Sequence, residues 1–213
     1  MKKTIIILLT IILANVAFAQ RPYGCIKQGT VMEYSQYDAD DDLTGISRTT
    51  IKSVKGSGNN YEVTIVTEIM GPDGTPLISP MESVTTYKDG KASVNVGSGS
   101  SGLTVEVGGD DISIPSKLAV GMLLDLGKIT ADISGIRTTM TITENEVIDR
   151  EEITTDAGTF KCYVIKQTAE SKVFGIKGVT TTKTWYARGV GAVRTETYLK
   201  GKISSSQILT KYE

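Results

Sequence analysis

The sequence predicts an all-β, mainly antiparallel protein, and two observations support this fold class. From Gly29 onward, apolar and polar residues alternate with a period of two, which is the pattern of strands that bury one face. The alternating runs are rich in Thr, Val, Ile and Tyr, and turn-forming pairs such as Asp73-Gly74 and Lys200-Gly201 separate them. Ten or more short strands at this spacing indicate a strongly curved sheet, a half-barrel or a sandwich.

The expected strands follow this alternation along the chain. In residues 60–69, Tyr61, Val63 and Ile65 point to one face and Glu62 points to the other, so this strand has one wet face. Equivalent patterns predict strands at residues 31–37, 46–54, 84–87, 103–107, 137–143, 147–153, 159–166, 179–186, 193–199 and 203–212.

Residues 114–124 break the strand pattern. Pro115 is suited to open a helical turn and Gly121 to end one, with Leu118 and Met122 on the same face. We therefore expect one short helical or 3₁₀ segment here, which caps an open end of the sheet.

The N-terminus has the features of a secretory signal peptide. Lys2 and Lys3 precede an apolar run at residues 5–13, and small residues at positions 17 and 19 suit a signal peptidase that cuts after Ala19. The apolar run is shorter than the ~20 residues of a spanning helix, and no lipobox precedes the first cysteine. We expect an exported protein, periplasmic or secreted, without a stable membrane anchor.

The domain organisation follows from this cleavage site. Residues 1–19 are the expected signal peptide, and residues 20–213 form a single exported β domain, with a subdomain boundary near 108–110 left open. Cleavage removes two of 23 basic residues and none of 24 acidic residues, which leaves a net charge of −3. Because no basic stripe accompanies this charge, we expect no nucleic-acid partner, and we expect a monomer.

The two cysteines, Cys25 and Cys162, invite a disulfide in an exported chain. The alternative is that both are buried free thiols that pack as small apolar residues. The sequence contains no histidine, so we expect no metal site and no cofactor.

Two short motifs have a loop interpretation and a ligand interpretation. Residues 97–102 (GSGSSG) match a dinucleotide fingerprint, but residues 103–107 after them read as a strand where that motif needs a helix. Residues 96–102 are therefore expected to be a flexible hairpin loop. The acidic run from Asp38 to Asp42 resembles the start of a calcium loop, yet Leu43 stands where that loop needs glycine. A solvated acidic turn is the alternative, and cation binding stays open.

A hydrolase triad is excluded by the absence of histidine. The remaining catalytic option is a pair of carboxylates, and strand alternation sends the available ones to both faces of adjacent strands. We therefore expect that the protein is not an enzyme. The carboxylates concerned are Glu144, Glu146, Asp149, Glu151 and Glu152.

Three stretches together resemble a known family. They are residues 111–116 (DISIPS) with Gly121, residues 155–163 (TDAGTFKCY), and residues 185–194 (WYARGVGAVR) with a C-terminal hairpin at Gly201. The likeness spans Cys25 to the C-terminus and is to the TapB-like exported proteins of Bacteroidetes, a family of unknown function. It brings no catalytic residues. By analogy, the resemblance implies the curved antiparallel sheet of LolA-like lipoprotein carriers.

These observations favour a non-catalytic exported binding module. An apolar small molecule such as a lipid would lie in a concave sheet, in an apolar cavity beneath residues 114–124. The expected ligand-binding residues are Leu118, Met122 and Leu123 of the cap, with Trp185 near the rim. A lone tryptophan can equally be a core anchor. The alternative function is a structural or protein-interaction component of the cell envelope without a ligand.

Overall fold

A computed structural model describes residues 23–58, 60–88, 91–96, 105–109, 114–115, 117–133, 136–173 and 176–213. Within these residues the chain forms one antiparallel sheet of twelve strands. The fold class predicted from the alternation is therefore confirmed. The strands are β1 (Val31–Asp38), β2 (Leu43–Ser57), β3 (Asn60–Met70), β4 (Met81–Lys88), β5 (Lys91–Val96), β6 (Val105–Gly109), β7 (Gly127–Ile133), β8 (Ile136–Thr155), β9 (Gly158–Val173), β10 (Ile176–Ala187), β11 (Gly191–Leu199) and β12 (Lys202–Tyr212).

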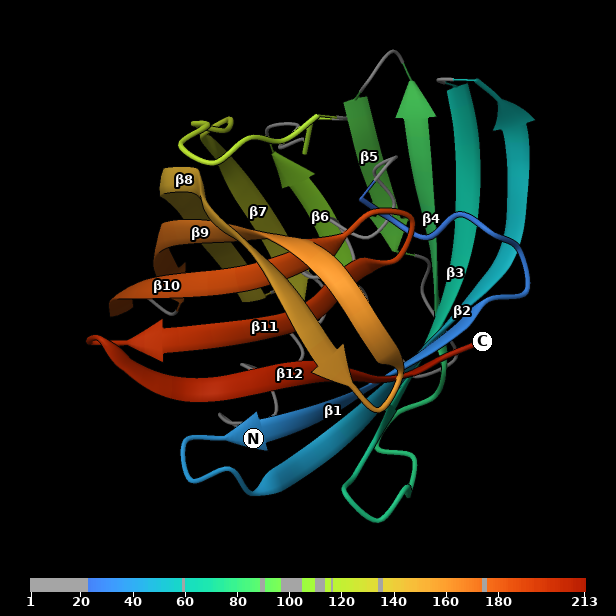
Figure 1. Cartoon of the computed structure of the whole chain (residues 1–213), viewed down its shortest axis with the longest axis horizontal. Coiled ribbons are helices and arrows are strands. Elements are labelled where there is room, and N and C mark those ends of the chain that lie inside the picture. Colours follow the sequence, from blue (N-terminus) through green and yellow to red (C-terminus); the bar gives the residue numbers. More distant parts are fainter. Residues whose placement is uncertain are drawn as a thin grey trace.

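The strand order forces the sheet to curve. The order is β5-β4-β3-β2-β1-β12-β11-β10-β9-β8-β7-β6, so β5 and β6 follow each other in sequence but lie at opposite edges. Laid flat, twelve strands would span about 53 Å at about 4.8 Å per spacing. The chain between Val96 and Val105 reaches at most about 32 Å. The edges must approach, and β5 and β6 do come near each other without pairing (Figure 1).

The core lies on the inner face of this curve. In β3, Tyr61, Val63 and Ile65 are all buried, as the alternation predicted. In β1, Tyr34 donates a hydrogen bond of 3.1 Å to the carbonyl of Ala192, which links β1 to β11 across β12. The fully buried side chains at the centre include Met32, Tyr34, Ile51, Val63, Ile65, Val147, Val164, Val193 and Leu209.

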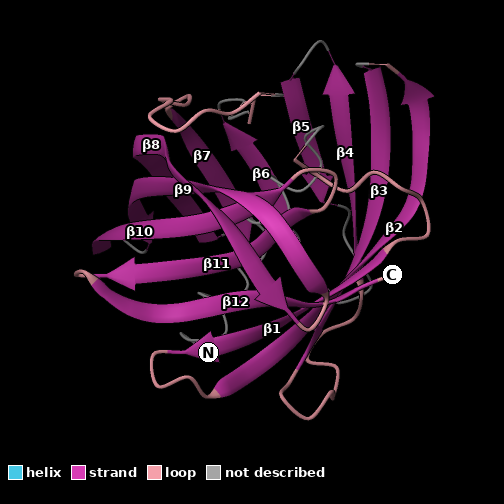
Figure 2. Ribbon diagram, viewed as in Figure 1, coloured by secondary structure: helices cyan, strands magenta, loops and turns pink. Residues whose placement is uncertain are grey.

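The hairpin of β8 and β9 extends beyond its neighbour and folds over the sheet. The last β9–β10 pair is Cys162 with Ala187, so the residues of β9 before Cys162 pair only with β8. Figures 1 and 2 show this overhang crossing in front of the sheet, and Phe160 near its tip packs against the core. Sequence alternation predicted two strands, at 137–143 and 147–153. The structure has one strand, because bulges after Ile142 and after Val147 reset the alternation without breaking β8.

The expected helical cap at residues 114–124 is wrong, since no helix occurs in the described part of the chain. The segment instead binds the edge of β8, which β7 leaves unpaired beyond Ile142. Backbone hydrogen bonds of 2.8–2.9 Å join Gly121 and Met122 to Val147, and Leu124 to Asn145. These bonds use backbone groups that a helix would need for itself, and Gly121 has a φ of 84°.

The expected disulfide is also wrong, because both thiols are free and buried. Cys25 lies beside the Tyr212 hydroxyl at 3.7 Å. Cys162 lies on β9 between its ladder partners Glu151 and Ala187. Both pack in the same apolar cluster as small buried residues, which is the alternative that the sequence left open.

Two predictions lie outside the described residues. These are the signal peptide at 1–19 and the loop at 96–102, of which only Val96, the last residue of β5, is described. The described residues include no helix that is long and apolar enough to cross a membrane.

Candidate functional site: a basic pocket beside the β8–β9 hairpin

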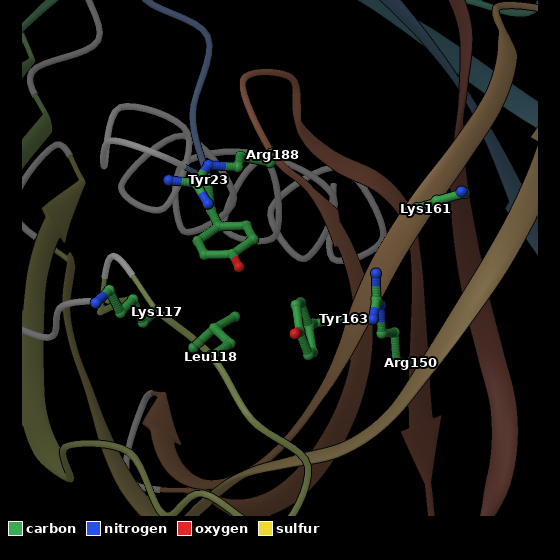
Figure 3. Close-up of a pocket in the computed structure, with 7 residues that line it drawn as sticks. All are labelled: Tyr23, Lys117, Leu118, Arg150, Lys161, Tyr163 and Arg188. Atoms are coloured by element: carbon green, nitrogen blue, oxygen red, sulfur yellow. The ribbon is translucent and has the colours of Figure 1, made fainter.

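A pocket of about 440 Å³ lies where four chain segments meet. The segments are the N-terminal strip before β1, residues 117–118, the overhanging β8–β9 hairpin and the turn between β10 and β11. Figure 3 shows Leu118 and the two tyrosines grouped at the centre, with Lys117 on one side and two cations of the hairpin on the other. The lining residues are Tyr23, Lys117, Leu118, Arg150, Lys161, Tyr163 and Arg188.

Strand alternation places the hairpin residues of the pocket. On β9, Cys162 and Val164 are fully buried in the core, so Lys161 and Tyr163 point to the other face. Tyr163 is the ladder partner of Arg150 on β8, which brings these two side chains to the same face of the hairpin.

The lining residues outside the hairpin include Arg188, Lys117 and Leu118, which lie in loops. Backbone conformation and backbone hydrogen bonds position these loops. Arg188 lies in the turn between β10 and β11, where Gly189 has a φ of 76° and Gly191 a φ of 112°. Lys117 and Leu118 come just before the stretch that is hydrogen-bonded to the edge of β8. The pocket therefore depends on the overhang of the hairpin and on the unpaired edge of β8.

Two tyrosines form the aromatic part of the pocket wall. The rings of Tyr23 and Tyr163 meet edge to face, with centroids 6.1 Å apart and an interplanar angle of 86°. The Arg150 guanidinium lies over the Tyr163 ring, 5.6 Å from its centroid, a distance suited to a cation–π contact. Burial is the main reason that the pKa of Tyr23 is raised, while the positive charges of Arg188 and Arg150 oppose that rise.

The pocket is strongly basic in a chain of net charge −1. Four of its seven lining residues carry a positive charge. Within the described part of the chain, none of the four has a carboxylate oxygen within ion-pair distance; the ion pairs there involve Arg48, Lys52, Lys166, Arg194 and Lys211 instead. Among the described residues, the pocket thus presents four positive charges without an ion-pair partner beside two aromatic rings.

The predicted ligand-binding residues are not brought together. Leu118 is buried and lines the pocket, but Met122 packs against the core and Leu123 is 77% exposed. Trp185 is buried in the core cluster and is not among the lining residues. A pocket does lie beside residues 117–118, but its wall is basic and aromatic where the sequence led us to expect an apolar one.

Sequence reasoning missed six of the seven lining residues, and no local signal marked them. Tyr23 and Arg188 are 165 positions apart, and the four cations sit in four different short stretches. Period-two alternation along residues 159–166 puts Lys161 and Tyr163 on the face opposite Cys162, but it does not show what faces them.

The candidate carboxylates Glu144 and Glu151 make hydrogen bonds with different partners. Glu144 accepts hydrogen bonds from Thr168 and Lys166, which lower its pKa, and Glu151 accepts one from Trp185. The acidic run is a turn in which Asp38 accepts hydrogen bonds from the amides of Asp40 and Asp42. The described residues contain no group of three or more acidic, cysteine or histidine side chains placed to hold a metal.

Comparison with known proteins identifies the family and the fold. The family model described as DUF3108-like matches residues 27–209, and no curated protein matches the sequence. The resemblance to a TapB-like family is not supported under that name, and neither is the LolA-like analogy.

Solved structures that share the fold include two from Bacteroidetes. One is a protein of Bacteroides fragilis NCTC 9343, provisionally described as exported with a YmcC-like fold; it is 20% identical, with a TM-score of 0.72 over 89% of this chain and 97% of that one. The other is provisionally described as a lipoprotein of Parabacteroides distasonis ATCC 8503; it is 21% identical, with a TM-score of 0.74 over 90% of this chain and 98% of that one. At these identities the likeness shows the fold alone.

Proposed function

Because this chain belongs to the DUF3108-like family, whose description names no activity, we propose its function from the pocket itself. We propose an exported, non-catalytic binding protein that holds a small molecule between Tyr23, Leu118 and the β8–β9 hairpin. The expected signal peptide supports export. The one observation that carries the proposal is the pocket of about 440 Å³, which falls within the range of ~300–1,000 Å³ typical of small-molecule sites.

The construction of the pocket also supports a binding role. Its floor is part of the core, since Tyr23 and Leu118 are buried there, while its four cations are exposed. A site with a rigid apolar floor and polar groups at the mouth can hold a ligand in one orientation. The carboxylates that a glycosidase-type mechanism would need are spread over separate contacts, which supports a role without catalysis.

Native mass spectrometry tests this proposal. The mature protein, isolated without detergent from its own envelope or secreted fraction, should carry an additional small-molecule mass that organic solvent removes. Lys117→Trp should fill the pocket and abolish this mass, whereas Lys55→Trp on the exposed end of β2 should retain it. A wild-type protein without any bound mass, or equal occupancy in Lys117→Trp, would contradict the proposal.

A second candidate function is a protein-interaction component of the envelope, and one observation favours it. The segment after the pocket exposes three large apolar side chains, Val120 at 56%, Leu123 at 77% and Leu126 at 58%. Exposed apolar groups this close together in sequence are typical of contact surfaces. Under this function, Leu123→Ser would abolish a chemical cross-link to an envelope protein in intact cells, and Lys117→Trp would leave that cross-link unchanged.

A further inference from the structure

We propose that the ligand of the basic pocket carries a phosphate group, which the guanidinium groups of Arg150 and Arg188 bind from two sides. Lys117 and Lys161 supply further positive charge at the mouth. This inference rests on the proposed binding function and adds the chemical class of the ligand.

The two arginines line one pocket although they come from different elements. Arg150 is on β8 and Arg188 is in the turn between β10 and β11. Figure 3 shows Arg188 beside Tyr23, and Arg150 beside Tyr163. Both arginines line the pocket, and their positive charges, that of Arg188 more than that of Arg150, act to lower the pKa of the Tyr23 hydroxyl in its wall.

The acidic side chains next to these arginines make their hydrogen bonds with other groups. Asp149 accepts a hydrogen bond from the backbone amide of Arg150, and Glu151 accepts one from Trp185 on β10. Glu152 is the ladder partner of Lys161, but no ion pair joins these two exposed side chains. Four like charges around one pocket repel one another, and a bound anion would relieve this repulsion.

A phosphate group suits this arrangement better than a single carboxylate. A phosphate monoester carries about −1.5 to −2 charges near pH 7 and three strong acceptor oxygens. Planar guanidinium groups bind such oxygens in bidentate fashion, while lysines act as mobile point charges. The amino ends of Lys117 and Lys161 turn outward in Figure 3, which fits a supporting role at the mouth. The hydroxyls of Tyr23 and Tyr163 add neutral donors.

The phosphate has two sources that the same chemistry would recognise, a lipid headgroup or a soluble phosphate ester. The pocket is open on the side of its exposed cations, and the chain that leads from it exposes Val120 and Leu123. Apolar side chains at the mouth would contact the acyl chains of a lipid. A soluble phosphate ester would contact only the pocket and would not need these apolar side chains.

Equilibrium binding at fixed ionic strength tests the proposal with three probes. These are inorganic phosphate, glycerol 3-phosphate and phosphatidylglycerol vesicles, with glycerol and phosphatidylcholine vesicles as uncharged or zwitterionic controls. The full mature chain should bind at least one phosphate probe, and Arg150→Gln with Arg188→Gln should weaken that binding about tenfold or more. The matched double variant Lys55→Gln with Lys202→Gln removes the same charge from exposed positions away from the pocket and should bind within about twofold of wild type.

The outcomes distinguish a lipid headgroup from a soluble ester, and they distinguish failure of the phosphate inference from failure of the proposed binding function. Binding of vesicles alone, weakened by Leu123→Ser, identifies a lipid headgroup, and binding of glycerol 3-phosphate, unchanged by Leu123→Ser, identifies a soluble ester. Equal affinity of wild type and the double arginine variant overturns the inference, and so does failure of all three phosphate probes. If native mass spectrometry still shows a bound mass that Lys117→Trp removes, the binding function stands and only the phosphate assignment falls.

Discussion

The indole Nε1 of Trp185 donates a hydrogen bond of 2.8 Å to Oε2 of Glu151, and this contact joins β10 to β8 across the intervening strand β9. The Arg194 guanidinium lies over the indole ring, 5.3 Å from its centroid. The single tryptophan is thus a buried anchor with a polar partner at its edge.

The first prediction concerns this anchor. Trp185→Phe keeps an aromatic ring but removes the donor to Glu151, so the free energy of unfolding should fall by about 1–2 kcal/mol. The measurement is urea unfolding followed by circular dichroism. Glu151→Gln is the matched control, since its amide oxygen still accepts the bond and its effect should be smaller. A Trp185→Phe protein as stable as wild type would show that the bond contributes nothing.

The second prediction concerns the two thiols. Because Cys25 and Cys162 are free and buried, a reducing agent should leave the thermal midpoint unchanged. A thiol-reactive chromophore should find almost no thiol in the native protein and two in the denatured, unreduced protein. Cys162→Ser should lower that count to one. A thermal midpoint that drops by several degrees on reduction would show that Cys25 and Cys162 form a disulfide after all.

The third prediction concerns alkaline pH. Burial raises the pKa of the Cys162 thiol from 9.0 to about 12, with a smaller contribution from the negative charge of Glu151. Between pH 9 and pH 12 the Cys162 thiol is ionised in the unfolded chain but still protonated in the folded chain. The stability that this thiol contributes is therefore fully present below pH 9 and decreases as the pH rises toward 12. One such group changes the free energy of unfolding by at most about 1.4 kcal/mol per pH unit.

Denaturant midpoints measured from pH 8 to the alkaline limit of folding check this slope. The tyrosines Tyr198 and Tyr212, whose pKa values burial also raises to about 12, contribute in the same direction. Cys162→Ser removes one titrating group and should make the decline shallower, whatever its effect on absolute stability. An unchanged slope in Cys162→Ser would mean that the thiol ionises equally in both states.

The fourth prediction compares two glycines of the β2–β3 hairpin. Gly56 has a φ of 95°, and a Cβ there would collide with the carbonyl oxygen of Asn60 and lie 2.9 Å from the Cα of Tyr61. Gly58 has a φ of 64°, but a Cβ there meets nothing within 4 Å. Gly56→Ala should therefore lower the free energy of unfolding by roughly 2–3 kcal/mol, and Gly58→Ala by about 1 kcal/mol. Equal effects in urea unfolding would exclude the backbone collision as a cause.

Prediction of the fold succeeded where one local property was sufficient. The buried set Tyr61, Val63 and Ile65 follows from period-two alternation alone, because successive side chains of a strand point to opposite faces. The strands β5 and β7 were not predicted, and β8 was divided in two. A β-bulge shifts the alternation of buried and exposed residues by one position. Alternation alone therefore indicates that a strand ends there.

Prediction of the site failed for a different reason. The cap was expected to be helical because Pro115 and Gly121 suit the two ends of a helical turn, yet an unpaired strand edge offered better partners for its backbone. The expected disulfide followed from the number of cysteines, whereas the distance between two sulfurs depends on how the N-terminal strip crosses the core.

The sequence by itself determined the fold class, most of the strands and the inward face of each, because these depend on neighbours within a few residues. It also placed Lys161 and Tyr163 on the face of their strand opposite Cys162. Only the tertiary structure decided that Tyr23, Leu118, Arg150 and Arg188 meet at one pocket. That meeting requires a twelve-strand sheet to curl, a hairpin to overhang its neighbour and a loop to bind the edge of β8, and each of these is a contact between residues far apart in the chain.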